Sequence, residues 1–126
     1  ERWIRSGGFL FSIMANSFVN KKADLTSNSA TTLYTVPSFS TAVIKSILVS
    51  EDSGNADTIT VTITDTSDNV FSLFKTKSIS ANATTELLSA PLIAQESEVI
   101  KVTAATANRL HVVLSALEIK PRDVTS

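Results

Sequence analysis

The side chains that could carry chemistry are few and widely spaced along this chain. His111 is the only histidine, and no cysteine occurs among the 126 residues. A single imidazole cannot build a histidine-rich metal site, and without thiols there can be no disulfide, thiolate nucleophile or cysteine-bound zinc. No Ser-His-Asp arrangement can be argued from one histidine within an apolar strand. We therefore interpret His111 as a structural or surface residue, and we predict no catalytic residue and no cofactor.

Carboxylates lie around two predicted turns, one at Gly54 and one over residues 65–69. They are Glu51, Asp52, Asp57, Asp65 and Asp68. Clusters of oxygen ligands suit hard cations such as Ca²⁺, but neither loop has the spacing of an EF-hand. Acidic residues are also ordinary turn formers, because their side chains bond to nearby backbone N–H groups. We therefore predict no metal site.

The overall charge argues against nucleic acid and membranes as partners. Eleven basic and twelve acidic residues give a net charge of −1, so no global field would hold a phosphate backbone or an anionic surface. The three glycines, Gly7, Gly8 and Gly54, form no phosphate-binding loop. No apolar run approaches the roughly 18 residues that a membrane-spanning helix needs.

The elements that must position these side chains are predicted to be strands. Ile59, Val61 and Ile63 alternate with threonines over residues 57–64, a period of two that is typical of a half-buried strand. Further strands are predicted at residues 31–36, 42–50, 70–77, 86–94, 99–104 and 110–119. Those at 42–50 and 110–119 are apolar on both faces and are expected in the middle of a sheet. Pro91 marks residues 86–94 as an edge or bulged strand.

Turn residues separate these strands at near-regular intervals, and no amphipathic helix is evident. This pattern predicts an all-β fold, a single antiparallel β-sandwich of either jelly-roll or immunoglobulin-like topology. Only Gly54 offers a free left-handed position in the turns, so asparagines are expected to take that conformation elsewhere. They are Asn55, Asn69, Asn82 and Asn108.

The chain divides into three segments: an extended N-terminal arm over 1–22, the sandwich over 23–120 and a C-terminal tail over 121–126. Residues 1–13, ERWIRSGGFLFSI, hold the only tryptophan and two of the three glycines. Met14 and the residues after it look like a natural start. Residues 1–13 are therefore either an upstream stretch read in frame or a genuine arm. A secretory signal is a third alternative, against which the short apolar run and weak cleavage site count.

Several strand and turn motifs resemble small virion proteins encoded by tailed bacteriophages. The resemblance begins with ATTLYTVP at 30–37 and AVIKSI at 42–47. It continues through residues 58–64, 80–88, 91–93, 99–104 and 112–119, and covers roughly 24–119. Two turns depart from the family pattern. Residues 38–40 lack the usual glycine after Pro37, and residues 95–98 lack the usual acidic-Gly-Asp sequence.

The resemblance implies a repeated, non-enzymatic building block of the particle, a capsid decoration (cement) protein or a neck or tail component. The implied location is the virion, after synthesis in the bacterial host cytoplasm. The expected partners are the major capsid protein or other virion proteins, together with further copies of this chain, a trimer being favoured. We expect the arm to order on a neighbouring subunit. Its predicted assembly residues are Phe18, Val19, Lys21 and Lys22.

The alternative is a neck, tail or fibre-associated module that recognises a host surface or a carbohydrate. An aromatic content of 6% counts against a sugar-binding platform. Four phenylalanines that could form such a platform are instead expected to be core or subunit-contact residues. They are Phe18, Phe39, Phe71 and Phe74.

Overall fold

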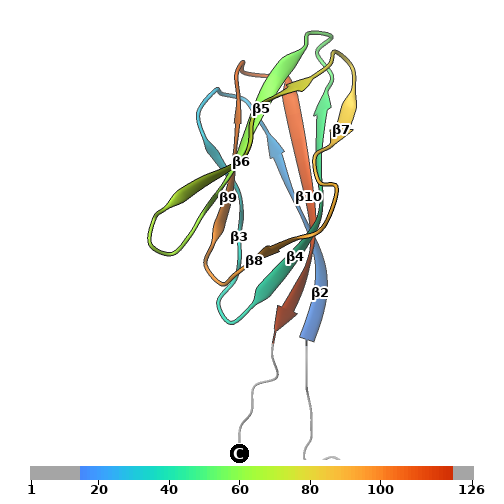
Figure 1. Ribbon diagram of the computed structural model, residues 1–126. Coiled ribbons are helices and arrows are strands. Elements are labelled where there is room, and N and C mark those ends of the chain that lie inside the picture. The colour runs from blue at the N-terminus through green and yellow to red at the C-terminus, as the bar shows by residue number, and fades with distance from the viewer. Residues whose placement is uncertain (1–14, 121–126) are drawn as a thin grey trace, which may run out of the picture.

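The computed structural model describes residues 15–120, which form two antiparallel sheets packed face to face (Figure 1). The first sheet contains β2 (Ala15–Asp24), β10 (Leu110–Lys120), β4 (Thr41–Glu51), β7 (Thr84–Glu86) and β8 (Leu92–Ala94). The second contains β3 (Thr31–Thr35), β9 (Val99–Ala104), β5 (Asp57–Thr64) and β6 (Val70–Ile79). The predicted antiparallel β-sandwich is therefore confirmed. No helix able to span a membrane occurs within residues 15–120.

The strands pair in a nested order that selects the jelly-roll topology. The first described strand, β2, pairs with the last, β10, and β3 pairs with β9. Inside these pairs, β4 pairs with β7 and β8, and β5 pairs with β6. The sheet orders are β2–β10–β4–β7, with β8 also on β4, and β3–β9–β5–β6. This nesting is the double Greek key of a jelly roll, in which no strand pairs with the one next to it in the chain except at the central hairpin.

The core lies between the sheets and comes from alternate residues of their strands. In β10, Leu110, Val112, Leu114 and Ala116 are buried, while the residues between them face the outside. The largest fully buried apolar side chains are Tyr34, Leu25, Ile44, Ile47, Ile59, Ile79, Ile100, Leu110 and Leu114. Full burial of one such aliphatic side chain stabilises the fold by about 1.5–3 kcal/mol.

Most strand predictions are confirmed, and two match the observed bounds, Asp57–Thr64 and Val99–Ala104. The two strands expected in the middle of a sheet also lie there. β4 has β10 on one side and β7 and β8 on the other, and β10 lies between β2 and β4.

The single strand predicted over residues 86–94 is wrong. The segment instead contributes two short strands, β7 and β8, which pair with different parts of β4. Pro91 lies immediately before β8, and proline has no N–H to continue a ladder. β7 pairs with residues 48–50 of β4 and β8 with residues 42–44, so a gap separates them.

The carboxylate of Glu86 fills this gap along the edge of β4. It accepts the Ile47 N–H at 2.8 Å and the Leu88 N–H at 3.2 Å, and it also accepts the Ser46 hydroxyl. Partial desolvation would raise the pKa of Glu86, but the hydrogen bonds from Ser46, Ile47 and Leu88 outweigh it and lower the pKa. A side chain therefore accepts the Ile47 N–H between β7 and β8, and the Ile47 carbonyl accepts the Leu87 N–H at 3.0 Å.

Residues 15–22, predicted as part of an extended arm, lie instead in β2. This strand runs antiparallel to the whole of β10, with Ala15 opposite Lys120 and Asp24 opposite His111. The long β10 offers a backbone ladder along its full length, and Val19 turns inward against the core. The sandwich therefore begins before residue 23. Residues 1–14 and the tail over 121–126 lie outside the described residues.

Two of the four asparagines expected in left-handed turns are in that conformation. Asn82 has φ 56° and Asn108 has φ 64°, as predicted. Asn55 and Asn69 do not have positive φ, so those two predictions are wrong. In the second of these loops the left-handed residue is Asp68, with φ 64°.

Candidate functional site

One row of residues across the outer face of the first sheet is apolar on all four strands that it crosses. In the pairing register, Phe18 of β2 lies opposite Leu117 of β10, and Leu117 lies opposite Val43 of β4. Val43 in turn lies opposite Ile93 of β8. The two ends are the most open, with Phe18 79% exposed and Ile93 50% exposed. We call Phe18, Leu117, Val43 and Ile93 the outer row.

The outer row stands apart from the rows beside it. In the next row towards residue 110, Ser115 of β10 lies opposite Asn20 and Ser46. One row further, Val113 lies between Lys22 and Leu48. Apolar residues aligned on a solvent-facing sheet do not contribute to the core, and such patches mark contact sites for other proteins.

The four predicted assembly residues all lie on β2, with their side chains divided between its two faces. Phe18 and Lys22 are on the outer face, opposite Leu117 and Val113. Val19 packs partly against the core, and Lys21 is opposite the buried Leu114 yet remains exposed at the sheet edge. The structure thus brings only Phe18 into the outer row. The assembly role of the four residues stays a prediction.

A second exposed aromatic, Phe39, is held in a strained turn between β3 and β4. Its φ is 60° and its side chain is 78% exposed. The Phe39 N–H donates to the Glu96 carboxylate at 2.9 Å. The facing turn contains Ser97, also left-handed at φ 67°, whose N–H donates to the Val36 carbonyl at 3.0 Å. These are the two turns in which the family resemblance leads us to expect glycine.

The conformation of Phe39 is costly for its residue type. A bulky side chain at positive φ is an outlier that costs about 1–2 kcal/mol. Strain of this kind persists where the surrounding structure holds it, and it accumulates at functional positions. The Phe39 side chain is exposed to solvent. The turn that carries it lies at the end of the sandwich where β2 begins and β10 ends (Figure 1). Phe71 is also exposed, whereas Phe74 packs partly against the core.

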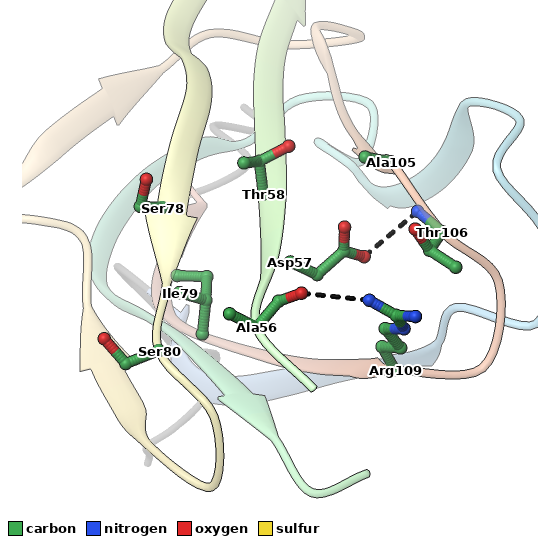
Figure 2. Close-up of a pocket in the computed structure, with 9 residues that line it drawn as sticks. All are labelled: Ala56, Asp57, Thr58, Ser78, Ile79, Ser80, Ala105, Thr106 and Arg109. Carbon is green, nitrogen blue, oxygen red and sulfur yellow. Dashed lines mark hydrogen bonds between the residues drawn. The ribbon is translucent and has the colours of Figure 1, made fainter. Parts of the chain in front are cut away.

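A cavity of about 330 Å³ lies at the start of β5, between the end of β6 and the turn before β10 (Figure 2). The Arg109 guanidinium donates to the Ala56 carbonyl at 3.0 Å. The Asp57 carboxylate accepts the Thr106 N–H at 3.0 Å. Both charged side chains thus hold the 105–109 turn against β5, and hydroxyls such as Thr58 and Ser78 line the remaining wall.

His111 lies at the surface, where it faces two carboxylates. Its Nε2 is 3.2 Å from the Asp24 carboxylate, and its Nδ1 is 3.5 Å from that of Asp52. The imidazole therefore connects the end of β2 to the turn after β4. Within residues 15–120, no group of three or more His, Cys, Asp or Glu side chains is suited to hold a metal ion.

The buried Glu51 organises the turns that lead into and out of the first sheet. Its carboxylate accepts N–H groups from Ser53 at 2.8 Å, Gly54 at 3.1 Å and Asn82 at 2.9 Å, as well as the Ser53 hydroxyl. Burial would raise the pKa of Glu51, but the bonds from Ser53 and Asn82 outweigh it and lower the pKa to about 2. Glu51 therefore acts in turn formation.

A buried polar pair that sequence reasoning missed joins the two sheets. Tyr34 of β3 donates its hydroxyl to the Glu118 carboxylate of β10 at 2.6 Å. Burial and the bond to Glu118 raise the pKa of Tyr34 above its usual range. The residues are 84 positions apart, and the alternation of β10 was the only signal that Glu118 points inward.

No protein-family model matches the chain, and no curated protein matches it. Two solved structures are similar to it. One is a chain of the virus-like particle of extra small virus from the giant freshwater prawn Macrobrachium rosenbergii, with a TM-score of 0.45 and 15% identity over 95% of this chain and 86% of that chain. The other is a chain of the cyanophage Pam1 capsid asymmetric unit, with a TM-score of 0.40 and 18% identity over 92% of this chain and 91% of that chain.

Proposed function

We propose that this chain is a non-enzymatic structural protein of a bacteriophage virion, and specifically a decoration (cement) protein. The outer row is the observation that carries this proposal. It forms an apolar band across the first sheet, whose end residues Phe18 and Ile93 are 79% and 50% exposed. An uncharged, apolar band of this kind suits a protein partner, because the centre of a protein interface is depleted in charged side chains.

In this proposal the outer row binds the major capsid protein, or another virion protein, across a contact between capsid subunits. The sandwich then resists separation of the subunits that it bridges. Phe39 supplies a second aromatic contact from the turn before β4. The protein functions as a homo-oligomer in the virion. Sequence analysis favours a trimer, and the dimer argued below from the edge of β2 is the alternative form.

The jelly roll does not itself select this function, since the same architecture builds capsid, lectin and cupin domains. The proposal therefore depends on the surface of this chain and on the family resemblance of its strand and turn motifs. It gives no residue a catalytic role. In the cavity beside β5, the charged groups of Asp57 and Arg109 are already bonded to the backbone.

The second candidate is a neck, tail or fibre-associated module that binds a host surface or carbohydrate. The cavity favours it, because hydroxyls and the Asp57 and Arg109 side chains line a space of about 330 Å³. A sugar would find hydrogen-bonding groups there but no aromatic ring among the lining residues. The decoration role is therefore the one we favour.

Cryo-electron microscopy of the intact particle that carries this protein tests the proposal. Density repeated over the capsid lattice in hundreds of copies is expected. Density confined to a ring or a few spikes at the tail would overturn the decoration role and favour the second candidate.

A matched pair of variants tests the outer row itself on undecorated capsids. Ile93→Glu places a charge in the outer row, and we expect it to reduce capsid occupancy at least tenfold. Phe71→Glu is the control, because Phe71 is similarly exposed, at 54% against 50%, but lies on β6 of the other sheet. Equal loss of binding in both variants, or in neither, would count against the outer row as the capsid contact.

A further inference from the structure

One side of β2 has no strand beside it within residues 15–120. The Leu25 N–H donates to the Leu110 carbonyl at 3.0 Å, and the Leu25 carbonyl accepts the Asn108 N–H at 2.9 Å. Alternate residues of an antiparallel strand direct their N–H and C=O groups to opposite sides. With no register shift along the β2–β10 pair, the even-numbered residues of β2 therefore direct these groups to the open edge.

Charge divides this open edge into two halves. Residues 16–20, with the sequence NSFVN, carry no charge, whereas residues 21–24, with the sequence KKAD, carry three. Lysines on an edge strand discourage pairing with another chain, above all where one points to the inner face of the sheet as Lys21 does. The charged half is thus closed to pairing, and the neutral half, centred on Phe18, has no neighbouring strand among the described residues.

We propose that residues 16–20 pair with the same residues of a second copy of this chain, antiparallel about a two-fold axis at Phe18. In this register Phe18 lies opposite Phe18 of the second copy, and Asn16 lies opposite Asn20. Asn16, Phe18 and Asn20 each direct their N–H and C=O groups to the open edge. The three residue pairs can therefore exchange about six hydrogen bonds in total. Such a contact is self-complementary, as a two-fold interface requires.

Side-chain charges disfavour registers whose axis lies nearer the charged half. Shifting the axis to Asn20 would place Phe18 opposite Lys22, and shifting it to Lys21 would set two lysines face to face, which is unfavourable. With the axis at Phe18, the two Lys21 residues are about 20 Å apart along the strands. Salt screens exposed charges at that separation, since the Debye length is about 8 Å at physiological ionic strength.

Pairing at Phe18 also extends the outer row. Because Phe18 is its last member, the row of one copy meets the row of the second copy at the two-fold axis. The dimer thus presents one continuous apolar band that runs from Ile93 to Ile93. The pairing itself does not depend on the virion role.

The mass of the full chain in solution tests the pairing. We expect size exclusion with light scattering to give twice the chain mass of 13.5 kDa. Asn20→Pro removes an N–H that faces the open edge and not β10, a position at which an edge strand tolerates proline. We therefore expect this variant to keep the β-rich circular dichroism spectrum and to halve the measured mass.

Lys22→Pro is the matched control, because it removes an outward N–H of the same strand in the charged half. We expect this variant to remain a dimer. A wild-type monomer or trimer at about 100 µM would overturn the proposal, as would loss of the dimer in both proline variants or in neither.

Engineered cysteines test the register, and the chain has no cysteine of its own. In the double variant Asn16→Cys/Asn20→Cys, each thiol faces its counterpart across a pair whose Cα atoms are about 5.5 Å apart, within disulfide range. We expect mild oxidation to link the dimer at least tenfold more efficiently than in either single variant. Equal linkage in a single variant would indicate another register and overturn the two-fold axis at Phe18.

Discussion

The five-stranded sheet has two edges, and the chain leaves them in opposite states. Beyond β4, two three-residue strands and the Glu86 carboxylate cover the backbone. Beyond β10, the ten residues of β2 form one unbroken strand whose outer side has no neighbour among the described residues. The first edge is thus made of strands too short to offer a long ladder, and the second is one long strand that carries charge along only half of its length.

The difference separates an edge that serves stability from one that is available for assembly. Glu51 holds Asn82 in the turn that enters β7, and Glu86 holds Ile47 between β7 and β8. Changes at these carboxylates should therefore alter the free energy of unfolding. Changes on β2 should alter association while the fold stays intact.

Glu51→Gln should have the largest effect on stability. The amide replaces a buried carboxylate that accepts several N–H groups, and its own NH₂ group would face those donors. We expect the largest fall in thermal midpoint of the variants considered, with faster hydrogen exchange over residues 80–88 than over 15–24. Glu96→Gln is the control, since Glu96 bonds the exposed Phe39 turn. An unchanged exchange rate over 80–88 would contradict the role given to Glu51.

Glu86→Ala should open the covered edge with a smaller loss. The Ile47 N–H loses its acceptor, but solvent can replace part of the bond at this exposed position. We expect a loss of about 1 kcal/mol in the free energy of unfolding, measured by urea denaturation. Glu86→Gln should lose less, because one oxygen still accepts. An unchanged free energy of unfolding in Glu86→Ala would show that β7 and β8 cover the edge without the Glu86 carboxylate.

Acid should weaken the covered edge before the open one. The folded pKa of Glu51 lies at about 2, below its ordinary 4.5, and that of Glu86 is also lowered. A carboxylate whose pKa is lowered by folding contributes stability to the folded state. For Glu51 this contribution is present above about pH 4.5 and is lost as the pH falls towards 2. We expect a constant thermal midpoint from pH 7 to 5 and a decline below 4.5, less steep in Glu51→Gln. An equally steep decline of the thermal midpoint in that variant would mean that groups other than Glu51 cause the acid sensitivity.

Lys21→Thr/Lys22→Thr should have the smallest effect on stability and a distinct effect on association. These exposed side chains make little difference to the fold, so we expect a change within about 0.5 kcal/mol. Removing the charges opens the remaining half of β2, and light scattering should then detect species larger than the dimer at high concentration. Lys101→Thr in the central strand β9 is the control and should not associate further. Identical behaviour of the two variants would mean that the lysines do not close the edge.

Local patterns predicted much of the fold. The alternation at residues 57–64 and 99–104 is clear enough to predict both strands with their observed bounds. Pro91, interpreted as the mark of one edge or bulged strand, instead lies between two short strands. The strand at 15–24 was not predicted, because only Val19 and Ala23 of its side chains pack on the core. Its polar sequence becomes a strand only because β10 supplies a partner ladder from the other end of the chain.

The sequence by itself determined most of the strands and the sandwich architecture, since the period of two is a local property. Tertiary structure alone decided the nested jelly-roll order, the Tyr34–Glu118 pair and the alignment of Phe18 with Leu117, Val43 and Ile93. The physical reason is register. A row across four strands depends on how distant segments pair, and core packing sets that pairing.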